Sequence, residues 1–119
     1  MQFKSLAAVV GLSVMSFFAS NAHAAGTGSG RISATVVEGT QYARIYVYGS
    51  HSSKPACATS GMFALDISTN KGKAMFSAIL AAALAGRVVE VIGNDNANRC
   101  DLIGTAETMT KLTFWTDDF

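Results

Sequence analysis

Four side chains with the chemistry to bind a ligand alternate along one stretch of the sequence, at Tyr42, Arg44, Tyr46 and Tyr48. Successive side chains of a β-strand point to opposite faces of the sheet, so this spacing places all four in one row. Aromatic rings stack on sugar faces, tyrosine hydroxyls form hydrogen bonds, and an arginine fork binds carboxylates. The row is therefore a candidate ligand-binding face. A second interpretation stays open, in which the same residues pack against neighbouring strands or another subunit.

The residues between these four predict the strand that carries them. Ala43, Ile45 and Val47 form an apolar face suited to a core, so residues 41–48 are expected to be a half-buried strand. Residues 31–38 also alternate, with Ile32, Ala34 and Val36 on the expected apolar side. The intervening Gly39-Thr40 is a turn signal, so the two strands should pair antiparallel. The polar residues 49–56, which include the single proline Pro55, are expected to form a loop.

One convincing helix follows a third predicted strand at residues 62–67. Residues 74–85 are almost all apolar helix formers, and Ser68 or Thr69 can cap the first turn with a hydroxyl oxygen. Gly86 occupies the position at which a left-handed residue ends a helix. The apolar residues of this helix occupy nearly every position. One apolar face is therefore left over after another face packs on the sheet. Either another subunit or long loops of the same chain would cover that face.

The predicted order is strand, strand, strand, helix, strand, strand, with the last two strands at residues 87–92 and 111–115. For residues 101–109, the sequence is compatible with either a short strand or a turn. A mainly β domain with one helix between its third and fourth strands is the order of the OB-fold, a five-stranded, partly open barrel. We therefore expect an α+β, OB-fold-like domain over residues 31–119.

The first 30 residues predict an exported protein. Residues 1–24 combine Lys4, an apolar run and an Ala22-His23-Ala24 ending, which is typical of a cleaved secretory signal peptide. The apolar run is too short to span a bilayer, so no membrane span is expected after cleavage. Residues 25–30, rich in glycine, are expected to be a flexible leader. The mature protein would be periplasmic or secreted, and its exact cleavage site stays open.

Charge and cysteine content narrow the function classes. Basic and acidic residues are nearly balanced, 9 against 8, so there is no basic stripe for a nucleic acid. The two cysteines, Cys57 and Cys100, predict one disulfide in an exported chain. Two free thiols, or half of a metal site with His51, are the alternatives.

The remaining clusters of polar and charged residues are more typical of solvated loops than of catalytic or metal sites. His51 lies among serines on one loop, whereas hydrolases bring such residues together from separate elements, so no enzyme is expected. Lys71 and Lys73 flank Gly72, but the other residues that a P-loop requires are absent, so no phosphate loop is expected there. Residues 94–101 are rich in Asn and Asp, but they lack the Gly and Glu that an EF-hand loop requires at fixed positions. We expect no catalytic residue, metal or cofactor.

Several short motifs resemble a family of small exported bacterial proteins related to the B subunit of subtilase cytotoxin. They are the two cysteines, residues 63–66, Gly-Lys-Ala-Met-Phe-Ser at residues 72–77, residues 80–82, residues 85–88 and Gly93. The resemblance covers most of the mature chain. It implies an OB-fold, a ring of five subunits, glycan binding and a catalytic A subunit as partner. The glycan pocket of the toxin has no matching residues here, so no site carries over.

These observations predict an exported, non-enzymatic binding module, glycan-binding and oligomeric, with Tyr42, Arg44, Tyr46 and Tyr48 as ligand-binding residues. The alternative is a monomeric periplasmic structural or inhibitory protein without a glycan ligand.

Overall fold

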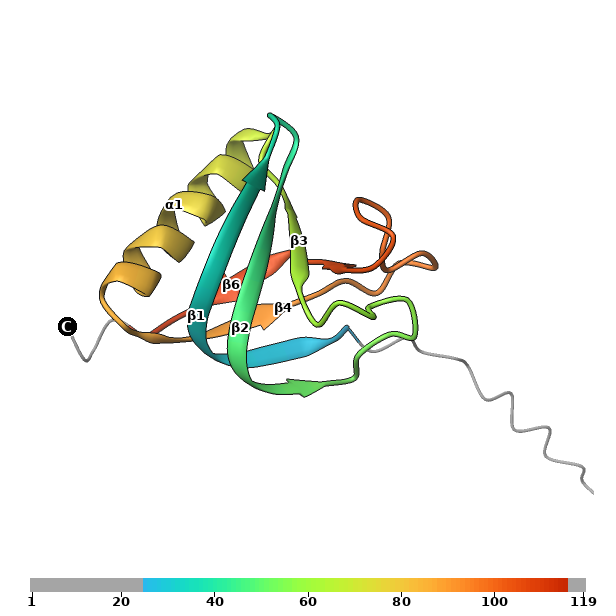
Figure 1. Cartoon of the computed structure of the whole chain (residues 1–119), viewed down its shortest axis with the longest axis horizontal. Coiled ribbons are helices and arrows are strands. Elements are labelled where there is room, and N and C mark those ends of the chain that lie inside the picture. The colour runs from blue at the N-terminus through green and yellow to red at the C-terminus, as the bar shows by residue number, and fades with distance from the viewer. Residues whose placement is uncertain (1–24, 116–119) are drawn as a thin grey trace, which may run out of the picture.

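The computed structural model describes residues 25–115. Its six-stranded sheet is curled, and one helix packs along the inner face of the sheet (Figure 1). The strands lie in the order β5-β3-β2-β1-β4-β6, and every neighbouring pair is antiparallel except the parallel pair β3 and β5. The elements are β1 (Thr27–Glu38), β2 (Tyr42–Ser52), β3 (Phe63–Asp66), α1 (Asn70–Leu84), β4 (Val88–Ile92), β5 (Glu107–Thr108) and β6 (Lys111–Thr113).

The predicted α+β class is confirmed, with the helix between the third and fourth strands. The sheet forms a half-barrel, as expected for an OB-fold-like order, and it gains one short strand, β5, from the segment that the sequence left open. The predicted signal peptide, residues 1–24, lies outside the described residues. Among residues 25–115, no helix has both the length and the apolar character to cross a bilayer.

The prediction of a flexible leader at residues 25–30 is wrong. Thr27 begins β1, and residues 27–31 pair with β2 on one side and β4 on the other. Glycine there does not provide flexibility. It lets the backbone approach buried groups closely, since a Cβ on Gly26 would lie 2.0 Å from a carboxylate oxygen of Glu107. The domain thus starts inside the stretch expected to be frayed.

The two longest strands, β1 and β2, bend together where two glycines pair. Gly30 lies opposite Gly49, and a Cβ on either residue would come within about 2 Å of a backbone oxygen of the other strand (1.9 and 2.0 Å). Side chains at this point would therefore force the strands apart. The bend lets β2 continue to Ser52, so residues 49–52, predicted as loop, belong to the sheet (Figure 1).

The predicted faces of β1 are wrong in its second half, because a β-bulge interrupts the strand. Ile32 pairs with Val47 on the inner face, but the register shifts by one residue before Ala34. Ala34 then pairs with Tyr46, and Val36 pairs with Arg44. Directly paired residues share a face, so Ala34 and Val36 lie on the outer face and not in the expected core.

The core lies between the inner face of the sheet and α1. Thr69 is the N-cap, with its hydroxyl oxygen accepting from the Gly72 N–H at 3.0 Å, and Gly86 follows the helix with a φ of 63°. Ile79 and Ala82 are buried, whereas Leu84 is 91% exposed. The buried residues of this core are Ala43, Ile45, Phe63, Leu65, Ile79, Ala82, Val89, Val91 and Met109.

Candidate functional site

The four residues of the predicted ligand face lie on the outer face of β2. They alternate with Ala43 and Ile45, whose side chains are fully buried against the helix side. The sheet therefore places them in one row, as the spacing predicts. Their surroundings differ greatly along this row, and the difference determines which of them a ligand can reach.

At one end of the row, a loop covers the two tyrosines Tyr42 and Tyr46. Both are half-buried and pack against a second apolar cluster, whose buried members are Met62, Ala64, Ile103 and Ala106. Residues 100–106, which we name the covering loop, supply two of these members. Tyr42 and Tyr46 therefore hold the covering loop on the sheet and expose only part of their rings.

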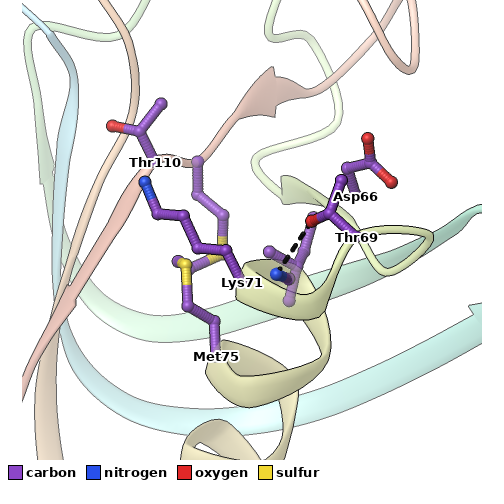
Figure 2. Close-up of a pocket in the computed structure, with 8 residues that line it drawn as sticks. Asp66, Thr69, Lys71, Met75 and Thr110 are labelled. Atoms are coloured by element: carbon purple, nitrogen blue, oxygen red, sulfur yellow. Dashed lines mark hydrogen bonds between the residues drawn. The ribbon is translucent and has the colours of Figure 1, made fainter.

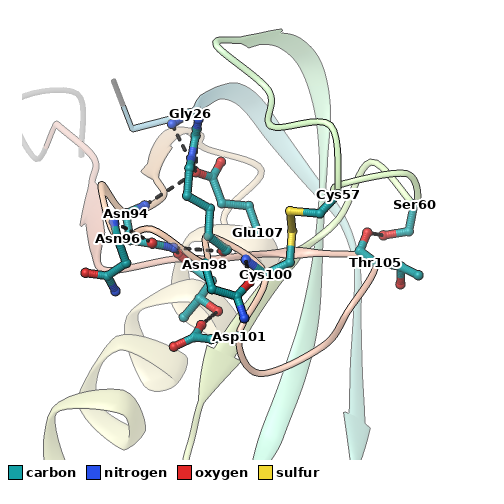
Figure 3. The surroundings of a disulfide bond; sticks show 12 residues. Gly26, Cys57, Ser60, Asn94, Asn96, Asn98, Cys100, Asp101, Thr105 and Glu107 are labelled. Atoms are coloured by element: carbon teal, nitrogen blue, oxygen red, sulfur yellow. Dashed lines mark hydrogen bonds and ion pairs between the residues drawn. A yellow bond between two sulfur atoms is a disulfide. The ribbon is translucent and has the colours of Figure 1, made fainter. Parts of the chain in front are cut away.

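Two tethers hold the covering loop in place. The predicted disulfide is confirmed: Cys57 and Cys100 are bonded, and the described residues contain no free cysteine (Figure 3). The Ser60 backbone N–H and hydroxyl both donate to the carbonyl of Thr105, at 3.1 and 2.6 Å. Both tethers connect the covering loop to the segment between β2 and β3.

Arg44, in the middle of the row, already has an acidic partner. Its guanidinium forms a 3.2 Å ion pair with Glu38, and the two side chains are 30% and 45% exposed. Its Nε is buried without a hydrogen-bond partner. Arg44 is thus held near the β1–β2 turn and is only partly available to a ligand.

At the other end, Tyr48 is open to solvent and belongs to a second row that crosses the sheet. It is 81% exposed and pairs with Arg31 of β1, which in turn pairs with Val88 of β4. Glu90 pairs with Thr113, so the antiparallel register brings Trp115 beside Val88. We name Tyr48, Arg31, Val88 and Trp115 the cross-strand row.

The cross-strand row borders a shallow hollow. Arg31, Gly86, Arg87, Val88 and Trp115 line a volume of about 200 Å³. Val88 and Trp115 are 50% and 54% exposed, and Arg31 is also exposed. Arg31 has no ion pair with another described residue. The hollow combines an aromatic ring and two guanidinium groups from segments that are distant in sequence.

A buried ion pair joins the ends of several segments on the far side of the domain from the helix C-terminus. Glu107 is fully buried, and its Oε2 accepts from Arg99 Nε at 2.9 Å and Nη2 at 2.7 Å. The backbone N–H groups of Gly26 and Asn94 donate to the same oxygen at 3.1 and 3.4 Å (Figure 3). Arg99 also donates to the carbonyl of Ser53 at 2.7 Å.

The geometry around Glu107 indicates a structural role. Its Oε1 is buried without a hydrogen-bond partner, in contact with Gly26 and Gly93, where an added Cβ would lie 2.0 and 2.5 Å away. Closely packed backbone surrounds this oxygen. Glu107 therefore connects the start of β1, the loop before Cys100 and β5, and sequence reasoning missed it because nothing local marks a buried glutamate.

The Asn- and Asp-rich loop uses its side-chain oxygens and amides internally. The Asn94 side chain donates to the carbonyls of Arg99 and Thr108 at 2.9 and 2.7 Å, and its Oδ1 accepts from the Asn96 N–H. Asn98 accepts from the Cys100 N–H, and Asp101 accepts from the Thr108 hydroxyl. No group of three or more His, Cys, Asp or Glu suited to a metal occurs among residues 25–115.

His51 packs on the inner face, away from the serines beside it in the sequence. Its ring stacks on Phe63, with 4.8 Å between the ring centroids, and its Nε2 is buried without a partner. Burial lowers the pKa of His51, an effect that the nearby Glu107 carboxylate opposes. A ring in this position cannot serve as a base for Ser50 or Ser52, which point to the opposite face.

A small pocket of about 120 Å³ lies at the N-terminal end of α1. In Figure 2, Lys71 reaches toward Thr110 and passes over Met75, while Asp66 lies on the other side of the helix start. The Thr69 cap engages the first helical amides, and the Ser68 hydroxyl and backbone N–H hold Asp66 and lower its pKa. With the Gly72 and Lys73 amides engaged by Thr69 and the Asp66 carboxylate nearby, this helix end is poorly suited to an anion.

The structure thus separates the predicted ligand residues and adds others. Only Tyr48 keeps an open ring. Arg31 of β1 and Val88 of β4 join it, together with Trp115, which lies two residues beyond the end of β6. Sequence pattern offered Trp115 only as part of the last strand. Comparisons of this chain with known protein families, with curated proteins and with solved structures found no match.

Proposed function

We propose that the protein is an exported, non-enzymatic binding module that recognises glycans through the outer face of its sheet around Tyr48. One observation supports this proposal most: Tyr48 is 81% exposed and lies directly beside Arg31 on the neighbouring strand. A tyrosine next to an arginine suits a sugar, because the ring can stack on a sugar face while the hydroxyl and the guanidinium form hydrogen bonds. OB-folds use one face of the barrel for oligosaccharides.

The environment of His51 supports the non-enzymatic part of the proposal. Its ring is stacked on Phe63, its Nε2 is buried, and the serines beside it in the sequence lie on the opposite face of the strand. Glu107, which is fully buried, is engaged with Arg99 and backbone N–H groups. Both groups are used for packing and folding.

We further propose that several copies associate, as the resemblance to a toxin B subunit implies, with five in a ring and a catalytic A subunit as partner. Leu80 and Leu84 of α1 and Val37 of β1 are exposed apolar side chains, at 38%, 91% and 51%. In addition, residues 32–38 of β1 pair only with β2 within the described chain. An apolar helix face beside a free strand edge suits association with another copy.

A glycan array tests the first part of the proposal. The wild-type protein should bind a defined subset of glycans, and Tyr48→Ala should lose most of that signal while keeping its fold. Gln41→Ala, an exposed change in the turn just before β2, is the control and should bind normally. An array without any bound glycan would contradict glycan recognition.

Light scattering tests association. The proposal expects an assembly of several subunits, which Leu84→Lys should break and Ala74→Lys, on another exposed helix position, should preserve. A wild-type protein with the mass of a single chain would favour the alternative, a monomeric periplasmic structural or inhibitory protein.

A further inference from the structure

We infer that removal of the signal peptide completes the buried ion pair, because cleavage after Ala24 creates an α-ammonium group at Ala25 that binds the Glu107 carboxylate. This inference rests on the export in the proposed function and adds a contact that depends on processing. Hydrolysis of the Ala24–Ala25 peptide bond by a leader-specific peptidase consumes one water. The water oxygen joins the carbonyl carbon of Ala24, which becomes a carboxylate, and both water hydrogens end on the Ala25 nitrogen, which becomes an ammonium.

The two carboxylate oxygens of Glu107 are used unequally. Oε2 accepts from Arg99 Nε and Nη2 at 2.9 and 2.7 Å, and from the Gly26 and Asn94 backbone N–H groups at 3.1 and 3.4 Å (Figure 3). Oε1 is buried and has no hydrogen-bond partner among residues 25–115. A buried acceptor without a donor costs free energy that a charged donor recovers. The arrangement therefore suits one further charged donor on the side of Oε1.

The start of β1 brings the new terminus to this oxygen. Gly26 is fixed on both sides, since its N–H donates to Glu107 and its carbonyl accepts from the Gly93 N–H at 2.8 Å. Oε1 lies against Gly26, where an added Cβ would be 2.0 Å away. One residue spans at most about 3.6 Å, so the nitrogen of the half-buried Ala25 lies within that distance of the bound Gly26 nitrogen. Rotation about the Ala25 Cα–C bond then directs the ammonium toward Oε1.

The charges around the carboxylate permit a second cation. Arg99 repels an ammonium, but it donates to Oε2, whereas the ammonium would donate to Oε1. Burial lowers the pKa of the neighbouring His51, so its ring is neutral at pH 7, and Lys54 is exposed to screening by water. Before cleavage, the Ala25 nitrogen is a neutral amide with one hydrogen. Cleavage gives it a charge and three donors, so the mature domain is more stable than the precursor domain.

Three forms of the mature chain test the contact. The first begins with a free Ala25, the second carries an acetyl group on Ala25, and the third keeps Ala24 as one extra residue. At pH 7, we expect the unfolding equilibrium constant of the free Ala25 form to be at least about tenfold smaller than that of the other two, because a hydrogen bond to a charged group contributes about that factor. Urea denaturation measures all three forms.

The pH dependence separates the charge of the terminus from the bulk of the acetyl group. The ordinary pKa of an α-amino group is about 7.7–8.0, and pairing with a carboxylate raises this pKa. The added stability is therefore complete below about pH 7.7 and is lost as the pH rises through the raised pKa. The difference between the free and acetylated forms should shrink from pH 7 to pH 10, whereas a steric effect of the acetyl group would stay constant.

Two substitutions assign the effect to Glu107. Glu107→Gln keeps the size of the side chain and removes its charge, so the difference between free and acetylated Ala25 should disappear. Lys54→Gln removes an exposed charge near His51, at the same end of the domain, and should leave that difference unchanged. Circular dichroism confirms that each variant is folded. If Glu107→Gln does not fold, the pH profiles of the wild-type forms decide.

Mass spectrometry separates this inference from the export on which it rests. When the full chain is expressed in an exporting bacterium, the mature protein should begin at Ala25. A chain that keeps residues 1–24 would overturn both proposals. A mature chain that begins at another residue would overturn the contact and leave export intact. The same conclusion would follow if the three forms unfolded at the same urea concentration, or if the difference between them persisted unchanged at pH 10.

Discussion

The outer face of the sheet has two ends with opposite uses of the same residue type. At one end, Tyr42 and Tyr46 lie under the covering loop and pack against apolar side chains. At the other end, Tyr48 is 81% exposed beside Arg31. Three tyrosines on the same face of one strand therefore divide into two structural residues and one available residue. The difference comes from residues about 60 positions away in sequence, which supply the covering loop.

The largest expected effect concerns the base of the covering loop. Glu107→Ala would leave Arg99 buried without its carboxylate, so the free energy of unfolding should fall by about 3–5 kcal/mol. Glu38→Ala, which removes the exposed partner of Arg44, should cost no more than about 1 kcal/mol. Urea denaturation measures both. Equal losses would show that the buried pair does not anchor the covered end.

Removing the disulfide should have a similar or slightly smaller effect. The bond joins residues 43 positions apart, and closing such a loop stabilises the folded state by up to about 4 kcal/mol in the chain-entropy model. In Cys57→Ala/Cys100→Ala, amide hydrogen exchange should accelerate in the covering loop and less around Arg31. A uniform acceleration over the whole sheet would contradict a tether specific to the covered end.

The direct comparison of the two ends uses two matched tyrosine changes. Tyr46→Ala removes a half-buried ring from the second apolar cluster and should cost about 1–3 kcal/mol of unfolding free energy. Tyr48→Ala removes an open ring and should change it by less than about 0.5 kcal/mol. Thermal unfolding measures both variants. If Tyr48→Ala were as destabilising as Tyr46→Ala, the open end would be structural too.

The smallest effect is a pH dependence from His51, on the inner face behind the open end. Burial lowers its pKa below the ordinary value of 6.5, so the folded state favours the neutral ring. The stability that it contributes is complete above pH 6.5 and is lost as the pH falls below that value toward the lowered pKa. His51→Gln should flatten the stability profile between pH 7 and pH 5. An unchanged slope in that variant would contradict this assignment.

Local chemistry made much of the fold predictable. The Thr69 cap, the Gly86 stop and the alternation of residues 41–48 are each encoded within a few neighbouring residues, and each was confirmed. The pairing of Cys57 with Cys100 was also predictable, because there are only two cysteines.

Features that depend on distant partners were not predictable. The bulge before Ala34 inverts the faces of the second half of β1, and no nearby residue predicts it. Glycines at residues 26–30 looked flexible because the buried Glu107 that they approach lies about 80 residues later. The cross-strand row could not be predicted from the sequence for the same reason, since it depends on the registers of β1, β2 and β4 and on the segment after β6.

The way β1 is completed has a consequence for how the chain folds. Its pairing with β2 is local, but the N–H of Gly26 binds a residue 81 positions later, and β4 also follows only after the helix. A newly made chain therefore forms the β1–β2 hairpin while the other edge of residues 27–31 stays unpaired. This unpaired edge has the sequence Thr-Gly-Ser-Gly-Arg, which contains no large apolar side chain. A glycine-rich start thus protects an unfinished sheet from aggregation through its open edge.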